Sequence, residues 1–454
     1  MTAAAPDAPS AGPAHRPATS RDIFAIAGPA MLANLTTPLL GIVATAAIGR
    51  LGNATLLGGV AMASVIFDCL FWLFGFLRMG TVAFTAQALG AGERGEIRAV
   101  LARGLCIAGI IGLLLIALQA PLANTILGMM GGSEGVTAAA RSYFVIRLWS
   151  APLVLANYVV LGWLVGQARA GLALCTQIAI NVTNMAVTVL LVLILDYGIA
   201  GAAIAAIAGE AVGFALGLSI AWLLNGRRLA VPLPDLLDRA KLLHMMAVNR
   251  DIMIRTAALI TAFLFFVAQG ARAGDVTLAA NSVLNNFLMI SAFFLDGLAN
   301  AAEQLCGRAY GARNRTAFSS ATRLAIGWGF GFAIAVTLVY ALGGPQLIDV
   351  MTASDEVRRT ARDYLWLVTL APLLGVFAFA YDGVFIGATW ARDMRNLMLL
   401  SLVIYLAAWY LLQPFGNAGL WGAMLVHYAA RGGLQALRYP ALLRASFGDR
   451  AKAR

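Results

Sequence analysis

The sequence is poor in charged residues, and this shortage excludes a soluble protein. Of its 454 residues, 12% are charged and 61% are hydrophobic, whereas a soluble domain carries about 25% charged residues. A soluble chain with so few charges would lack the polar side chains that cover a water-exposed surface. The mean hydropathy of +0.82 predicts an integral membrane protein instead.

The groupings of residues that serve nucleotide-driven or metal-dependent chemistry are also missing. No GxxxxGK[ST] loop occurs, so an ATP-driven pump within this chain is excluded. The three histidines, His15, His244 and His427, are far apart in the sequence, and the four cysteines lie in or beside apolar runs without CxxC or Cys/His spacing. We therefore predict no cofactor, no metal site, no disulfide framework and no catalytic residues.

The apolar residues fall into runs long enough to cross a bilayer, which takes about 20 residues of helix. Twelve such runs occur, at about 23–48, 56–88, 99–122, 138–165, 171–195, 198–224, 251–272, 277–305, 320–343, 360–387, 395–413 and 418–440. The fold class predicted is all-α integral membrane, with twelve transmembrane helices. We expect the outer faces of these helices to contact the lipid bilayer.

The longest polar break divides these runs into six and six. We expect a disordered cytoplasmic tail (1–20), an N-lobe (21–224), a cytoplasmic inter-lobe loop (225–250), a C-lobe (251–440) and a basic cytoplasmic tail (441–454). Lys and Arg are about three times as frequent in one set of alternate loops as in the other. Because positive charge stays in the cytoplasm, both termini are predicted to be cytoplasmic. The same pattern accounts for the net charge of +11 without a nucleic-acid partner.

The two halves repeat each other. Residues 130–136 match 351–357, and residues 140–143 match 361–364. The same separation in sequence relates Gly162 to Gly383 and Gly166 to Gly387, and we call this separation the repeat offset. A weaker match aligns 76–78 and 87–90 with 294–296 and 304–307. Six helices are an even number, so the halves are parallel, with a substrate path between them that rocking would open to each side in turn. A duplicated scaffold without a transport role is the alternative.

Ionisable residues within the runs are the candidates for ion coupling, because a charge inside a bilayer needs a partner or a wet cavity. Asp296 and Glu303 are seven residues apart and so share one helical face. Asp382 lies in the tenth run, and Arg255 could pair with such acids. We predict that these four residues, Asp296, Glu303, Asp382 and Arg255, couple transport to an ion. A buried structural ion pair is an equally good reading for any one of them.

Polar residues within the runs predict a cleft whose walls hydrogen-bond substrate or water. The polar residues predicted for the cleft are Asn34, Arg78, Asn181, Asn184, Thr188, Asn281 and Asn285. Amides also hydrogen-bond between helices in membranes, so a packing role remains open for each asparagine.

Several sequence motifs follow one another along both halves of the chain. They are Pro38–Gly52, Trp72–Thr81 with Ala86–Gly90, Gly270–Gly274 with Leu278–Asn281, Asp296–Ala299, Glu303–Gly307, Asp382–Gly387 and Arg392–Arg395. With these motifs in this order, the sequence resembles the multidrug and toxic compound extrusion family, in its DNA-damage-inducible-like branch, over about residues 20–445. The resemblance implies two six-helix lobes around a V-shaped central cleft. It also implies export of small organic, cationic or amphiphilic compounds against inward flow of H⁺ or Na⁺, by a monomer in the bacterial inner membrane.

The sequence departs from the family pattern in the N-lobe. The resemblance also adds Ala44 to the predicted cleft, where it replaces the family's acid in the first helix. Thr188 stands where an Asp follows the family's Asn, here Asn184. The C-lobe acid is kept as Asp382, so the resemblance implies coupling mainly through the C-lobe. A lipid-linked precursor flippase of related architecture, a channel and a membrane-embedded enzyme remain as alternatives, and the scattered histidines weigh against the enzyme.

Overall fold

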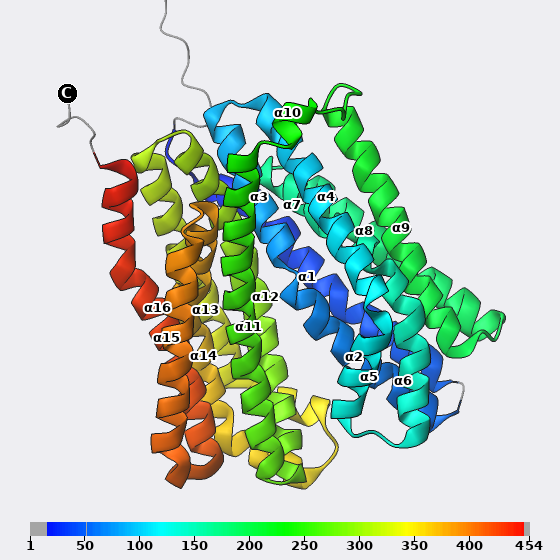
Figure 1. Cartoon of the computed structure of the whole chain (residues 1–454). Coiled ribbons are helices and arrows are strands. Elements are labelled where there is room, and N and C mark those ends of the chain that lie inside the picture. The colour runs from blue at the N-terminus through cyan, green and yellow to red at the C-terminus, as the bar shows by residue number, and fades with distance from the viewer. Residues whose placement is uncertain (1–15, 51, 449–454) are drawn as a thin grey trace, which may run out of the picture.

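The fold is described from a computed structural model that covers residues 16–50 and 52–448, without the side chains of 37–39. Every regular element in this part of the chain is helical, and no strand occurs in it. The prediction of an all-α protein is therefore confirmed. Figure 1 shows the helices gathered into two lobes that lean apart.

The N-lobe begins at the first helix and includes two places where a predicted run is broken. The run 56–88 divides at Phe74 and Gly75, and the run 138–165 divides just before Pro152, whose ring nitrogen has no proton to donate. Its elements are α1 (Ser20–Gly49), α2 (Ala54–Leu73), α3 (Phe76–Ala91), α4 (Arg94–Ala117), α5 (Gln119–Met130), α6 (Glu134–Arg147), η1 (Leu148–Ser150), α7 (Ala151–Gly166), α8 (Ala170–Thr188), the π-helical turn η2 (Val189–Ile194) and α9 (Gly198–Leu224).

The C-lobe follows a short connecting helix, α10 (Leu233–Leu236), and is made of long helices. They are α11 (Arg239–Arg272), α12 (Asp275–Gly311), α13 (Arg315–Met351), α14 (Asp355–Gly387), α15 (Ala391–Leu412), η3 (Gln413–Phe415) and α16 (Gly416–Phe447). The predicted inter-lobe loop 225–250 therefore ends earlier, because α11 begins at Arg239. The helix starts there because the Asp238 side chain accepts the Ala240 and Lys241 amides, which an apolar run does not reveal.

Eleven segments of the described chain are long and apolar enough to cross a membrane. The last of them, residues 391–447, contains two helices, α15 and α16, which reverse direction at Gly416 (φ +57°) and pack against each other. Counting these two separately gives the twelve crossings that the sequence predicts.

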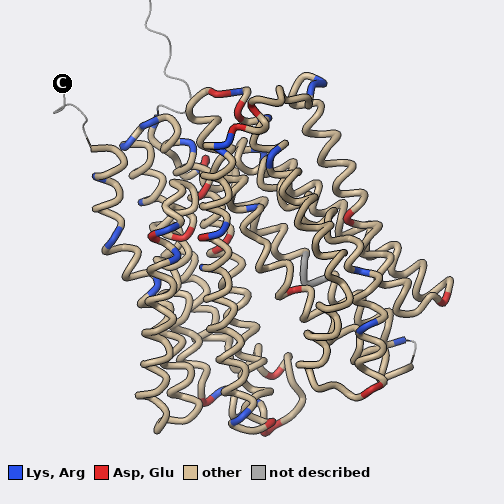
Figure 2. The backbone as a smooth tube through the Cα atoms, in the orientation of Figure 1, with Lys and Arg blue, Asp and Glu red and all other residues tan. Residues whose placement is uncertain are grey.

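The start of α1 and the end of α16 lie at the same end of the molecule, which we call the termini end (Figure 1). Ser320 at the start of α13 bonds the Ala18 carbonyl, and Tyr310 contacts Phe447. The expected tail 1–20 is thus docked from Arg16 onward, while residues 1–15 and 449–454 lie outside the described chain. Figure 2 shows that Lys and Arg concentrate at the termini end.

The two lobes meet at the termini end through a symmetric contact between α3 and α12. A Cβ at Gly90 would meet the carbonyl oxygen of Arg308, and a Cβ at Gly311 would meet that of Gln87. The repeat offset relates Gly90 to Gly311 and Gln87 to Arg308. The sequence-based match of 87–90 with 304–307 is therefore displaced by one helical turn, because a Gln-x-x-Gly pattern recurs by chance along α12.

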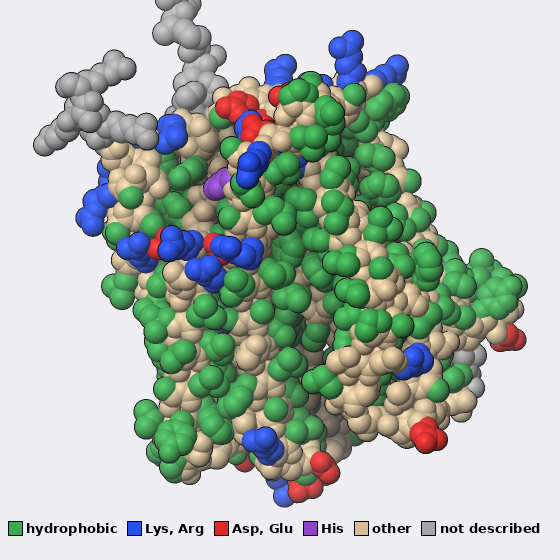
Figure 3. All heavy atoms as spheres, in the orientation of Figure 1, with side chains coloured by type: hydrophobic (Ala, Val, Ile, Leu, Met, Phe, Trp, Pro, Cys, Tyr) green, Lys and Arg blue, Asp and Glu red, His purple; other side chains and the backbone are tan. Residues whose placement is uncertain are grey.

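Two hydrogen bonds close the same end from opposite sides. Gln87 of α3 donates to the Gly387 carbonyl (2.7 Å), and Gln304 of α12 donates to the Gly166 carbonyl (3.2 Å). A surface ion pair between Lys241 and Glu96 (2.6 Å) adds a third link between the lobes. At the opposite end, called the far end, the surface is hollowed between the lobes (Figure 3).

Candidate functional site

Polar side chains of α12 meet α1 and α3 where the lobes adjoin. Asn34 of α1 donates to Asp296 (3.3 Å), and Asn300 also donates to Asp296 (3.4 Å). Arg78 of α3 donates to the Asn300 oxygen (2.8 Å). These four residues form a network across the lobe interface, which we call the interface network. It brings together Asn34, Arg78 and Asp296, three of the residues predicted for the site, through Asn300, which the sequence analysis did not select.

Glu303 lies two turns beyond Asp296 on α12 and is 3% exposed. Its Oε1 has no hydrogen-bond partner among the described residues. Arg78, Asp296 and Arg255 are the charged groups that face it. Because an isolated carboxylate is costly to bury, this side chain is the polar group of the site least compensated by its neighbours.

Asp382 of α14 is the centre of a second cluster inside the C-lobe. One carboxylate oxygen receives both Arg255 of α11 and Arg431 of α16, and the other accepts the Gln435 amide (2.8 Å). All four side chains are buried. The arrangement neutralises Asp382 with two guanidinium groups and fills both of its oxygens. We call this the arginine cluster.

Arg431 and Gln435 are absent from the sequence-based site. Together with His427 they recur every four residues on α16, so they share one face of that helix. His427 accompanies them there and contacts the Ser401 carbonyl (3.3 Å). This polar stripe in an apolar helix could have indicated that the three residues belong to the site. Their partner Asp382, however, lies on α14, and the sequence does not show that α14 and α16 pack together.

The other N-lobe residues predicted for the cleft belong to α1 and α8, two helices that pack against each other. Asn181 donates to Thr36 of α1 (3.0 Å), and Thr188 donates to Asn184 (3.2 Å). Ala44 lies on α1 and is half-buried. One uncharged hydrogen bond, from Asn181 to Thr36, thus links α8 to α1, and the bond between Thr188 and Asn184 lies within α8.

The N-lobe nevertheless carries acids on other helices. Glu210 of α9 accepts the Asn157 amide of α7 (2.7 Å). Asp68 lies on α2, and the Arg147 guanidinium of α6 faces both acids while lying 4.9 Å from the centre of the Phe67 ring. The N-lobe interior is therefore polar, although not at the positions where the family pattern places its acids.

Asn281 and Asn285 lie near the far end of α12. Asn281 and Asn417 exchange reciprocal amide bonds (2.8 and 2.9 Å), and Trp421 donates to the same Asn281 oxygen (2.9 Å). This buried set ties α12 to α16. Asn285 is half-buried one turn further along α12.

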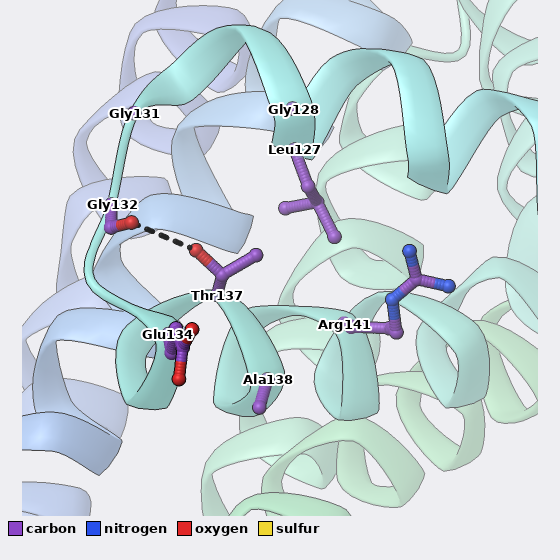
Figure 4. Close-up of a pocket in the computed structure, with 8 residues that line it drawn as sticks. All are labelled: Leu127, Gly128, Gly131, Gly132, Glu134, Thr137, Ala138 and Arg141. Atoms are coloured by element: carbon purple, nitrogen blue, oxygen red, sulfur yellow. Dashed lines mark hydrogen bonds between the residues drawn. The ribbon is translucent and has the colours of Figure 1, made fainter.

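A hollow of about 470 Å³ lies between α5 and α6 at the far end of the N-lobe (Figure 4). The stretch Gly131–Gly135 beside it has the GxSxG spacing of hydrolases. Ser133, however, caps the N-terminus of α6 by accepting the Val136 amide, and it follows a helix rather than a strand. Its position gives no nucleophile turn of the kind that hydrolases use.

Metal binding finds no support in the described chain, where no group of three potential ligands from His, Cys, Asp and Glu comes together. The polar centre thus consists of the interface network, the arginine cluster and Glu303 between them. Its members belong to α1, α3, α11, α12, α14 and α16, so a movement of the lobes would change the distances between them.

Two repeated six-helix lobes with ionisable groups buried between them define a multi-pass membrane transporter. The MatE family model matches residues 29–190 and 252–411, one stretch in each lobe, so the chain belongs to the MatE family. Members of this family are transporters and not enzymes, so the membrane-embedded enzyme considered as an alternative is excluded.

Relatives and solved structures agree with this assignment. The chain is 36% identical to DNA damage-inducible protein F of Escherichia coli over 417 residues, which cover 91% of each chain. It is 28% identical to a probable multidrug resistance protein NorM of Caulobacter vibrioides, over 89% of this chain and 87% of the relative. A solved structure described as an outward-facing multidrug resistance MATE family transporter matches with a TM-score of 0.84 and 20% identity, over 94% of this chain and 96% of the other, and shows the same fold.

Proposed function

We propose that this protein exports small organic compounds, cationic or amphiphilic in character, in exchange for protons, with Glu303 as the proton carrier. The observation that carries the proposal is the buried Glu303 carboxyl, whose Oε1 has no partner while Arg78 and Arg255 face it. Binding a proton would neutralise this buried carboxylate and remove the free-energy cost of burying its charge.

The arrangement of the other acids supports Glu303 over Asp382. Asp382 already has two arginines and a glutamine amide on its oxygens, so a proton or Na⁺ would have to displace them. Asp296 accepts two amide hydrogen bonds. In this conformation Glu303 therefore offers the site where an added proton removes the largest electrostatic cost.

Movement of the lobes provides the coupling. Arg78 belongs to α3 of the N-lobe, and Glu303 belongs to α12 of the C-lobe, so rocking changes the distance between them. A ligand shifts a conformational equilibrium only by its differential affinity for the two states. A proton on Glu303 would favour the state in which Arg78 is further away, and the charged carboxylate would favour the state in which it is near.

Charge distribution and the closed end support a direction of transport. Lys and Arg concentrate at the termini end (Figure 2), and positive segments remain in the cytoplasm, so we place that end in the cytoplasm of a bacterial inner membrane. The lobes meet there and are hollowed at the far end, which corresponds to a state open to the outside. Both lobes belong to one chain, so a monomer is the expected working unit.

The test uses the full-length protein in proteoliposomes with an imposed pH gradient or an imposed Na⁺ gradient, and a fluorescent organic cation as substrate. Wild type should accumulate the cation with the pH gradient and not with the Na⁺ gradient. Glu303→Gln should lose pH-driven accumulation yet keep exchange of labelled for unlabelled cation, since the lobes still move. Glu134→Gln, an exposed acid at the far end, is the matched control.

Two results would contradict the proposal. Accumulation by Glu303→Gln with an unchanged response to pH would remove Glu303 as the carrier. Accumulation that follows only the Na⁺ gradient would replace the proton as the coupling ion.

A further inference from the structure

The face of α2 that is turned toward the other lobe carries a charged residue near the middle of the membrane. Along α2, the buried side chains include Val60, Ala63, Phe67 and Phe71, whereas Ala61, Val65, Asp68 and Trp72 form one exposed stripe. Trp72 contacts Phe263 of α11, with 6.0 Å between ring centres. Since Asp68 and Trp72 are one turn apart on a helix, they share this face.

The depth of Asp68 makes its exposure informative. It lies almost four turns from the start of α2, or about 21 Å along the helix, within a 38-residue segment that crosses the membrane. A carboxylate exposed to hydrocarbon at this depth costs several kcal/mol, and an Asp side chain is too short to reach the headgroups. Because Asp68 shares a face with Trp72, which contacts Phe263 of the other lobe, its exposed side must contact water or a ligand between the lobes.

No cation of the described chain forms a salt bridge with Asp68. The opposite charge that faces it is Arg147, whose guanidinium lies over the Phe67 and Tyr143 rings and donates to the Tyr143 hydroxyl (2.7 Å). Asp68 is therefore partly compensated at a distance and remains free to take a second cation.

We propose that Asp68, Trp72 and Phe263 form a binding site for lipophilic organic cations in the cleft between the lobes. The carboxylate supplies the counter-charge, and the two rings supply apolar surface and a face that attracts cations. The site draws one residue pair from α2 and one residue from α11, so it is shared by both lobes and would change when they rock. This inference rests on the proposed export of organic cations and specifies where they bind.

The proposed cation site and the proposed proton carrier use different acids. Asp68 lies on α2 and Glu303 on α12, so cation and proton would occupy different sites and influence each other through the lobe movement. Linkage of this kind is reciprocal: a cation that favours one arrangement of the lobes weakens or strengthens proton binding by the same factor.

The experiment compares two probes of equal size and shape and opposite charge, tetraphenylphosphonium and tetraphenylborate. Their binding to the full-length protein in nanodiscs is measured, with empty nanodiscs subtracted. Wild type should prefer the phosphonium. Asp68→Asn should weaken phosphonium binding about tenfold, as expected for a lost charge-assisted contact, and leave borate binding unchanged or stronger. Asp68→Glu should restore the preference.

Trp72→Leu tests the aromatic part and should weaken phosphonium binding roughly threefold to thirtyfold, whereas Glu134→Gln should leave it unchanged. The inference is overturned if Asp68→Asn binds the phosphonium as wild type does, or if wild type shows no preference between the probes. Failure of proton-driven accumulation with a selective binding defect in Asp68→Asn would instead contradict the proposed function and leave this site standing.

Discussion

The symmetric glycine contact between the lobes leads to a quantitative prediction about the conformational equilibrium. A Cβ placed on Gly311 would lie 2.7 Å from the Gln87 carbonyl carbon and 2.8 Å from its Cα. These atoms belong to the backbone and have no rotamer to which they can move. Gly311→Ala should therefore force α3 and α12 apart at the termini end.

The size of the effect follows from overpacking, which costs roughly 1–3 kcal/mol when a methyl group enters a filled space. The cost applies to the state in which the lobes meet at the termini end and disappears once they separate there. With about 2 kcal/mol, the ratio of the two states should shift roughly thirtyfold toward opening at that end. Gly90→Ala should act equally, since it meets the Arg308 carbonyl in the equivalent way.

The assay is distance measurement between spin labels in nanodiscs, in a variant without the native cysteines. Labels at Arg228 and Arg444 report on the termini end, and labels at Glu134 and Asp355 report on the far end. Gly311→Ala should lengthen the first distance and shorten the second. Gly95→Ala is the control, because a Cβ there meets nothing within 4 Å. Unchanged distributions in both Gly311→Ala and Gly90→Ala would refute the view that this contact limits opening.

Other consequences concern individual contacts. Asp382→Asn should lower the free energy of unfolding by roughly 3–5 kcal/mol, because it leaves buried arginines uncompensated; a loss below about 1 kcal/mol in thermal unfolding would contradict the arginine cluster. Gln87→Ala and Gln304→Ala should each favour opening at the termini end by roughly 0.5–1.5 kcal/mol, measurable with the same spin labels, and an effect from neither would exclude these bonds as a latch. Asn281→Leu should cost roughly 1–3 kcal/mol of stability through the partners it leaves unsatisfied, with an unchanged proton dependence of transport; a change in that dependence would indicate a role in the cleft instead.

Much of the architecture could be predicted from the sequence, because a membrane imposes simple requirements. The apolar runs gave the crossings, the polar segment after 224 gave the division into lobes, and the repeat gave parallel halves. The same method missed the start of α11 at Arg239 and the extension of α16 to Phe447. The start of α11 and the end of α16 lie outside the apolar runs. Charged residues there can form helix or loop, so hydropathy does not show where the helix ends.

The candidate site was predictable only in part, for a physical reason. Asp296 and Glu303 lie on one helix, so helical periodicity was enough to place them on one face. The partners of Asp382 lie on α11 and α16, and contacts between separate helices depend on packing that periodicity does not contain. Asn300 was not selected, although it lies one turn from Asp296 and the same helical periodicity places it on that face.

The repeat shows which parts of the lobes are equivalent and which are not. Gly166 and Gly387, which the repeat offset relates, make the same close backbone contacts with α3 and α12, at Val82 and Glu303 respectively. The same offset relates Glu210 to Arg431 and Leu161 to Asp382, so corresponding positions in the two lobes carry opposite charge or none. Backbone packing is thus symmetric between the lobes, while the ionisable groups at these equivalent positions differ. The proton carrier proposed above, Glu303, belongs to the C-lobe, so a proton bound there would act through these symmetric contacts on a movement that both lobes share.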